Sequence, residues 1–196
     1  MSAPLVMVID CGSTTITVTA VGERGDLVRS ASKPNTAHPQ AGGAEGWVVW
    51  DLDEIWAKIG ALCRQVSEAV DRDSVVAVTA TAFGADGAPV RPGGSLAYPV
   101  ISWQCSRTQG LVGRVAELLS PWEVYQQTGY QIIQFNTLLR LLWLRENAPE
   151  VLQPPNRWLM MPGVVRTFAT MSGTEPSPTL VGMTIWPARY LANLAG

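Results

Sequence analysis

Short apolar or β-branched segments separated by polar turns occupy the first 35 residues. Residues 5–9 form a short apolar run that ends at Asp10, and residues 16–21 follow with a β-branched pattern typical of a strand. A turn at residues 23–26 allows residues 27–31 to return as a third strand. Two consecutive hairpins of this kind predict an antiparallel β-meander.

The period of the apolar residues then changes from strand to helix. Residues from 52 onward recur at helical spacing and predict an amphipathic helix to about residue 70, with Asp51 as N-cap and Glu54 completing a capping box. Further strands are expected at 74–79 and 98–103, a small-residue loop at 80–87, and helices at 106–119, 122–127, 136–147 and 188–194. Pro162 and Gly163 leave residues 158–171 ambiguous.

Composition and charge narrow the class of protein. The chain has 196 residues, of which 47% are hydrophobic and 15% charged, and this suits one globular domain, or one and a fragment of another. With 14 basic and 16 acidic residues, the net charge of −2 argues against a nucleic-acid partner. No apolar stretch is long enough to cross a membrane, and the N-terminus lacks the basic start of a secretory signal. We therefore expect a soluble, cytoplasmic protein.

Several common sites are excluded by residue type and spacing. The three cysteines are far apart and form no C-x-x-C pair, which makes a disulfide framework or a thiolate zinc site improbable. His38 is the only histidine, so no multi-histidine metal site can form, and we expect it in an ordinary surface loop. The G-x-G-x-x-G fingerprint is absent and neither lysine follows a glycine, so any phosphate cradle must be of another kind.

The turn after the first strand is a candidate phosphate-binding loop of another kind. Asp10 is followed by Cys11 and then by Gly12, Ser13, Thr14 and Thr15. A tight turn of small residues can direct backbone N–H groups at an anion, with neighbouring hydroxyls as further donors. An aspartate at the strand end can hold Mg²⁺ against phosphates. A plain β-hairpin with a hydroxyl-rich turn is the alternative.

The turn is the first of five segments that resemble, in order and spacing, the FGGY family of carbohydrate kinases in the actin-like ATPase superfamily. The five segments are residues 8–15, 50–56, 78–88, 98–108 and 135–147. Within the family, residues 78–88 and 98–108 are most similar to the kinases of the 6-deoxy ketoses L-fuculose and L-rhamnulose. Arg140 stands where the family motif has lysine, and residues 172–178 lack the Asp of the family's T-D pair.

The resemblance implies the fold. We expect an α/β, actin-like ATPase (ribonuclease H-like) domain, with a mixed sheet that contains the antiparallel β-meander and has flanking helices. Family members are more than twice this long and have two such domains. By this resemblance, residues 1–196 would be an incomplete N-terminal, sugar-binding domain, without the C-terminal nucleotide domain. The family's general-base aspartate would lie beyond Gly196, so no catalytic residue is assigned.

The resemblance also implies ATP and Mg²⁺ as cofactors. Asp10 would organise Mg²⁺, and Thr14 would hydrogen-bond the transferred phosphoryl group. The neighbouring Gly12, Ser13 and Thr15 would complete the nucleotide-phosphate site.

A ketose pocket is implied by the third and fourth segments. It would include Phe83, and Gly84 and Asp86 would line it, the Asp86 carboxylate accepting hydrogen bonds from sugar hydroxyls. Trp103 would offer an apolar face, and Arg107 a charged donor at the rim. The structural alternatives are a turn role for Asp86, a core position for Trp103 and a solvated helix start for Arg107.

Three functional hypotheses follow. The first is the N-terminal part of an ATP-dependent kinase that phosphorylates a ketose such as L-fuculose in carbohydrate catabolism, nearly inactive as an isolated chain. The second is a non-catalytic sugar-binding or regulatory module derived from such a kinase. The third is a decayed product that barely folds. The expected partners are a small ketose and, where a cleft face is left uncovered, a missing C-terminal half or a second copy of the chain.

Overall fold

The computed structural model describes residues 3–170 and 184–187, and these form two compact units. Unit 1 comprises Met1–Thr36, Asp51–Gly84 and Met161–Gly196, and unit 2 comprises Ala37–Trp50 and Ala85–Met160. The chain therefore leaves unit 1 twice to build unit 2, so that residues distant in sequence meet within each unit.

Unit 1 is built on a five-stranded mixed sheet with the order β10-β6-β1-β2-β3. The antiparallel meander is formed by β1 (Leu5–Cys11), β2 (Thr15–Gly22) and β3 (Leu27–Pro34). β6 (Val75–Ala82) pairs with β1 in parallel, and β10 (Thr184–Pro187) pairs with β6 in antiparallel orientation. The predicted meander and mixed sheet are confirmed.

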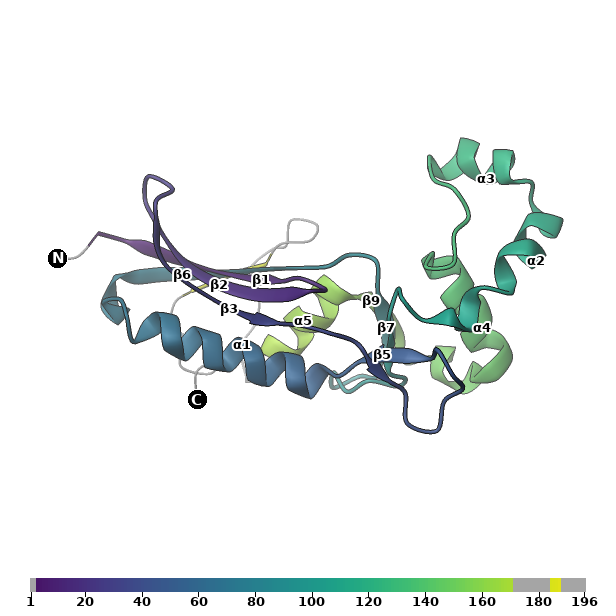
Figure 1. Ribbon diagram of the computed structural model, residues 1–196, viewed down its shortest axis with the longest axis horizontal. Helices are drawn as coiled ribbons and strands as arrows, with labels where there is room; N and C mark the ends of the chain where they lie inside the picture. Colours follow the sequence, from purple (N-terminus) through teal and green to yellow (C-terminus); the bar gives the residue numbers. More distant parts are fainter. Residues whose placement is uncertain (1–2, 171–183, 188–196) are drawn as a thin grey trace. The chain divides into compact units, whose positions relative to one another are not determined.

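Helix α1 (Leu52–Ser67) packs against β2 and β3 and runs along the sheet in Figure 1. Alternate residues of β1 and β2 are buried, and the apolar stripe of α1, including Ile59 and Leu62, is buried with them. The helix begins as predicted, because an Asp51 oxygen accepts a hydrogen bond from the Glu54 N–H at 3.0 Å. It ends at Ser67, and the short helix η1 (Arg72–Ser74) leads into β6.

The ambiguous segment near residue 160 contains both a strand and a helix. β9 (Arg157–Met160) ends where α5 (Met161–Thr170) begins, and α5 packs against β6. Pro162 and Gly163 lie in the first turn of α5 rather than interrupting it. Proline is tolerated there because the first N–H groups of a helix have no intrahelical acceptor.

Unit 2 combines two small sheets with short helices. One sheet has the strands β4 (His38–Pro39), β5 (Val48–Trp50) and β8 (Val100–Ile101), and the other pairs β7 (Gly87–Val90) with β9. The helices are η2 (Ser106–Thr108), α2 (Leu111–Leu118), α3 (Pro121–Thr128), α4 (Thr137–Asn147) and η3 (Pro149–Leu152).

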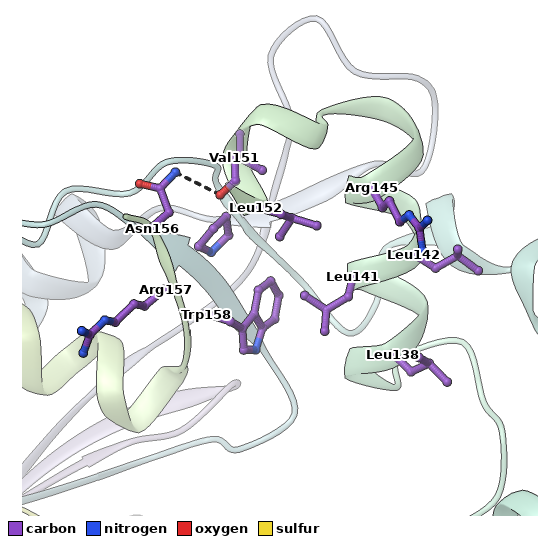
Figure 2. A pocket seen from close by; sticks show the side chains of 10 residues that line it. Leu138, Leu141, Leu142, Arg145, Val151, Leu152, Asn156, Arg157 and Trp158 are labelled. Carbon is purple, nitrogen blue, oxygen red and sulfur yellow. Dashed lines mark hydrogen bonds between the residues drawn. The ribbon is translucent and has the colours of Figure 1, made fainter. Parts of the chain in front are cut away.

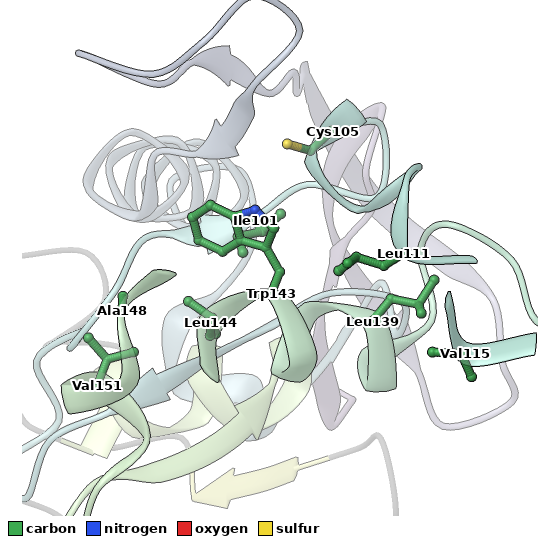
Figure 3. Close-up of a cluster of buried hydrophobic side chains, with 9 residues drawn as sticks. All are labelled: Ile101, Cys105, Leu111, Val115, Leu139, Trp143, Leu144, Ala148 and Val151. Carbon is green, nitrogen blue, oxygen red and sulfur yellow. The ribbon is translucent and has the colours of Figure 1, made fainter. Parts of the chain in front are cut away.

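The core of unit 2 gathers around α4 (Figure 3). Trp143 and Leu144 of this helix pack with Ile101 of β8 and Leu111 of α2. At the other sheet, a Cβ on Gly87 would lie 2.5 Å from the carbonyl oxygen of Leu159. The close approach of β9 to β7 therefore requires glycine at that position.

Three predicted elements differ from the observed ones. The strand expected at 98–103 is only Val100–Ile101, and the helix expected at 106–119 is divided into η2 and α2 at Gly110. The loop expected at 80–87 is shorter, since β6 runs to Ala82. His38 lies in β4 and is half-buried rather than in a surface loop.

The expectations for residues 172–178 and 188–194 fall outside the described residues. Within the described ranges, none of the helices has the length and apolar character that a membrane crossing needs.

Candidate functional site

The candidate phosphate turn lies at the carboxyl end of β1, beside the end of a parallel neighbour. Asp10 is opposite Thr17 on β2 and is paired in register with Thr81 on β6. Its side chain is exposed, whereas Cys11, next along the chain, is buried. Ligands of open α/β sheets bind beyond the carboxyl ends of parallel strands, so this edge is where an anion site is expected.

Gly12 sets the shape of the turn. Its N–H donates to the Thr15 carbonyl at 3.0 Å, which closes the bend between β1 and β2. A Cβ on Gly12 would lie 2.6 Å from that same oxygen, closer than atoms approach without displacement. No other residue fits here unless the turn opens.

Asn35 supports the turn from beyond the end of β3. Its Nδ2 donates to the Gly12 carbonyl at 2.9 Å, and its backbone N–H donates to the Thr14 carbonyl at 2.8 Å. Sequence reasoning missed this residue, although the β2–β3 hairpin register places Pro34 opposite Thr15 and so brings the next residue beside the turn. Within the described part of the chain, the buried Asn35 Oδ1 has no hydrogen-bond partner.

The outer face of the turn keeps its donors free. Across residues 3–170 and 184–187, no intramolecular hydrogen bond uses the hydroxyls of Ser13, Thr14 and Thr15 or the backbone N–H groups of Ser13 and Thr14. Ser13, Thr14 and Thr15 are exposed or half-exposed, and they follow the exposed Asp10 closely along the chain. Such a donor set fits phosphate oxygens, and a single carboxylate suits Mg²⁺, which keeps most of its waters. Among the described residues there is no cluster of three His, Cys, Asp or Glu side chains that could hold a metal without the phosphates.

Phe83 and Gly84 extend β6 past its last paired residue, still within unit 1. The Phe83 N–H donates to the Cys11 carbonyl at 3.1 Å, which holds this segment beside the start of the turn. A Cβ on Gly84 would meet no atom within 4 Å. The glycine is therefore not required by packing, and its missing side chain leaves open space there.

Asp86, in unit 2, is placed differently from the expectation. It is fully buried, and its Oδ2 accepts hydrogen bonds from the Trp50 indole at 2.6 Å and the Trp103 backbone N–H at 3.0 Å. Its Oδ1 forms an ion pair with Arg140 Nη2, also at 2.6 Å. A carboxylate that accepts sugar hydroxyls must reach the ligand, and this one is occupied by protein donors. The turn role is equally inconsistent with a buried ion pair.

The titration of Asp86 reflects this burial. Loss of hydration raises the pKa of the carboxyl, while the charge of Arg140 and the hydrogen bonds from Trp50 and Trp103 act in the opposite direction. Burial likewise lowers the pKa of Arg140 and the Asp86 carboxylate opposes that shift. Each charge of the pair is thus compensated mainly by the other.

Trp103 was expected to offer an apolar face to a sugar, and the structure leaves it partly exposed. Its side chain is 36% exposed rather than enclosed in the core. The ring meets Phe135 edge to face, with the centroids 6.3 Å apart. An indole held in this way can stack against the carbon skeleton of a sugar.

Arg107 is buried, which corrects the expectation of a rim donor and excludes the alternative of a solvated helix start. Its Nη1 donates to the Tyr98 hydroxyl at 3.1 Å and its Nη2 to Gln40 Oε1 at 2.5 Å. Its guanidinium carbon lies 4.4 Å from the Trp47 ring centroid and 4.9 Å from that of Trp143. Cation–π contacts and neutral acceptors therefore stabilise this charge inside unit 2.

A separate cavity of about 410 Å³ opens in unit 2 between α4, η3 and β9 (Figure 2). Leu141, Leu152 and Trp158 line it with apolar side chains, and Arg145 and Arg157 stand at its margin. None of the sequence-predicted site residues lines this cavity, so it is distinct from both candidate sites.

Comparison with known proteins agrees with the motifs. The chain is 35% identical to the L-fuculokinase of Salmonella typhi over 183 residues, covering 89% of the chain and 39% of that enzyme. It is 34% identical to the L-fuculokinase of Escherichia coli K12 over 211 residues, covering 99% of the chain and 44% of that enzyme. The chain thus spans about two-fifths of the length of these curated relatives. A rhamnulokinase of Yersinia pestis is 32% identical over 119 residues, 60% of the chain and 24% of that protein.

Solved structures show the same fold. The gluconate kinase of Lactobacillus acidophilus matches with a TM-score of 0.73 at 18% identity, over 86% of this chain and 33% of its own. The glycerol kinase of Plasmodium falciparum with ADP matches with a TM-score of 0.71 at 18% identity, over 86% and 34%. The sequence model of the FGGY carbohydrate kinases, N-terminal domain, matches residues 5–172. The chain therefore belongs to the FGGY family of carbohydrate kinases, with the actin-like ATPase fold that the sequence predicted.

Proposed function

We propose that this chain supplies the nucleotide-phosphate turn and part of the sugar-binding surface of an ATP-dependent ketose kinase, with L-fuculose or a closely related 6-deoxy ketose as acceptor. The observation that carries the proposal is the turn at residues 12–15, where the hydroxyls of Ser13, Thr14 and Thr15 and the N–H groups of Ser13 and Thr14 have no hydrogen-bond partner among the described residues and follow an exposed aspartate. The similarity to L-fuculokinases over most of the chain supports the choice of sugar.

In this proposal the turn binds the phosphates of ATP through its outer face. The N–H groups of Ser13 and Thr14 and the Thr14 hydroxyl donate to phosphate oxygens, and Asp10 holds Mg²⁺. Bound Mg²⁺ would neutralise part of the charge that develops on the phosphates. Positioning and charge stabilisation are the main requirements of phosphoryl transfer, and the turn can meet both without changing its conformation.

The sugar-facing groups are assigned separately in the two units. In unit 1, the space beside Gly84 would admit a ligand group, and in unit 2 the exposed Trp103 ring would stack against the ketose carbons. Asp86 is assigned no contact with the sugar, because it is fully buried. No general base is assigned among the described residues, since Asp86 is enclosed and Asp10 is committed to the metal.

The test is a coupled assay of ADP release with ATP, Mg²⁺ and a panel of L-fuculose, L-rhamnulose, D-xylulose and glycerol. We would assay the protein expressed from its complete reading frame together with Thr14→Val, which keeps the shape of the side chain but removes its hydroxyl. L-fuculose should be the best acceptor, and Thr14→Val should lower kcat on the order of 10²-fold. Equal rates for the two proteins, or no turnover with any ketose, would contradict the proposal.

A non-catalytic sugar-binding module is the second outcome that this experiment separates. It would bind L-fuculose in calorimetry while releasing no ADP under any condition. The free donors of the turn argue for the kinase, because sugar binding alone would not need them.

A further inference from the structure

Two buried charged residues of unit 2, Arg140 and Asp86, form a chain of contacts that ends at the backbone of Trp103, whose ring is exposed. Arg140, on α4, is 1% exposed, and its two terminal nitrogens reach two different acceptors. Nη2 pairs with Asp86 Oδ1 at 2.6 Å, and Nη1 donates to the Ala85 carbonyl oxygen. The guanidinium therefore fixes both the backbone and the side chain at the start of the segment that leads into β7.

Asp86 in turn accepts hydrogen bonds from two tryptophans. Its Oδ2 accepts from the Trp103 backbone N–H at 3.0 Å and from the Trp50 indole N–H at 2.6 Å. Trp103 lies just after β8, and Trp50 ends β5, which pairs with β8. The Asp86 carboxylate thus links the main chain at Trp103 to Trp50 of β5 and, through Arg140, to α4.

We infer that Arg140 is a positioning residue for ketose binding, acting through Asp86 to hold the Trp103 ring in a fixed place. This inference rests on the proposed function for its sugar, but the positioning itself can be measured without any ligand. A ring held in advance loses little freedom when a sugar stacks on it, so the constraint should improve affinity. Arg140 donates to two acceptors at once, which a planar guanidinium can do. The ammonium group of a lysine is a point charge and would not be equivalent.

The test uses the 196-residue chain labelled with 5-fluorotryptophan. The chain has eight tryptophans, and loss of one ¹⁹F resonance in Trp103→Phe identifies the resonance of Trp103. The variant is Arg140→Lys, which keeps the charge but can no longer reach both acceptors with a rigid fork. The matched control is Arg114→Lys, because Arg114 also pairs through two nitrogens with one carboxylate, that of Glu146, at 2.9 and 2.6 Å, but its side chain is 55% exposed.

Without ligand, Arg140→Lys should shift and broaden the Trp103 resonance, while Arg114→Lys should leave it unchanged. In the protein expressed from its complete reading frame, Arg140→Lys should bind L-fuculose on the order of tenfold more weakly than the unmodified protein, as expected when a supporting contact is lost and the Trp103 ring moves. Arg114→Lys should change the Kd less than twofold. An Arg140→Lys chain with a native Trp103 resonance and native L-fuculose affinity would overturn the inference.

The two proposals fail in different ways. If the unmodified protein expressed from its complete reading frame binds no L-fuculose, the sugar assignment of the proposed function is wrong, and the ligand-free Trp103 resonance of the 196-residue chain still decides whether Arg140 positions the ring. If that protein binds L-fuculose but Arg140→Lys behaves like Arg114→Lys in both measurements, only the positioning inference is wrong. Circular dichroism of each variant checks that a loss of binding does not come from unfolding.

Discussion

The two candidate binding regions differ in whether their polar groups have hydrogen-bond partners within the protein. At the turn of unit 1, Ser13 is half-exposed and Thr14 exposed, and their hydroxyls and N–H groups have no hydrogen-bond partner in the described structure. In unit 2, the Asp86 carboxylate is fully buried and accepts three N–H groups. Exposed donors without protein partners are available to a ligand, whereas a fully buried carboxylate that accepts three protein N–H groups contacts only its neighbours. Motif residues of one family can therefore serve binding in one place and support in another.

The largest expected effect tests the supporting role in unit 2. Arg140→Met removes one partner of a buried ion pair and leaves Asp86 as an uncompensated charge. This should lower the free energy of unfolding by about 3–5 kcal/mol, measured by urea denaturation. Arg114→Met breaks an exposed pair with Glu146 and should cost far less. Similar losses for the two variants would remove the distinction between the buried and the exposed pair.

The second effect tests the binding role in unit 1. Asp10→Asn keeps the size of an exposed side chain but removes the charge that would hold Mg²⁺. Kinase activity of the protein from the complete reading frame should fall on the order of 10²–10³-fold, with an unchanged melting temperature. Asp26→Asn, at an exposed turn of the same meander, is the control and should retain activity. A comparable loss in both variants would mean that the Asp10 effect is not specific to the turn.

The third effect concerns the one buried polar side chain that supports the turn. Asn35→Ala deletes the hydrogen bond to the Gly12 carbonyl but keeps the backbone bond to Thr14. The free energy of unfolding should fall by about 1 kcal/mol, the usual net value of such a bond. Asn35→Asp offers no amide donor to that carbonyl and should be at least as unstable. An Asn35→Ala chain as stable as the unmodified one would show that the turn holds its shape alone.

The smallest effect concerns a buried thiol of unit 1. Burial raises the pKa of Cys63 to about 12, so the folded chain keeps the thiol proton at a pH where the unfolded chain releases it. The stability that this proton contributes is present at pH 8 and is lost as the pH rises toward 12. Between pH 8 and 9.5 the loss should be about 1 kcal/mol by urea denaturation. Cys63→Ala should remove this part of the pH dependence, and an identical slope in the variant would contradict the assignment.

The sequence predicted those parts of the fold whose signals are local. The meander follows from short apolar and β-branched segments joined by turns, and α1 follows from helical spacing and the Asp51 cap, all of which act within a few residues. The two-residue strand β8 and the division between η2 and α2 depend on packing within unit 2, which local propensity does not record.

The candidate site was also predictable only where its signal is local in the sequence. The turn follows from its small residues after Asp10, but Asn35 is brought to it only by the β2–β3 register. The partners of Asp86 come from three separate segments at Trp50, Trp103 and Arg140, so no spacing rule could have shown that its carboxylate was occupied. Residue identity selected the candidate region, and tertiary contacts determine which of its polar groups remain available to a ligand.

The most direct test of the account is a ¹H–¹⁵N NMR titration of the chain with magnesium tripolyphosphate, which carries the phosphates of ATP without its adenosine. The account predicts that the amide signals of Ser13 and Thr14 shift most, because their N–H groups are free, while that of Gly12, bonded to the Thr15 carbonyl, shifts less. Asp10→Asn should weaken the effect. Shifts confined to arginine-bearing surfaces, with the Ser13 and Thr14 signals unmoved, would contradict the claim that this turn binds phosphate.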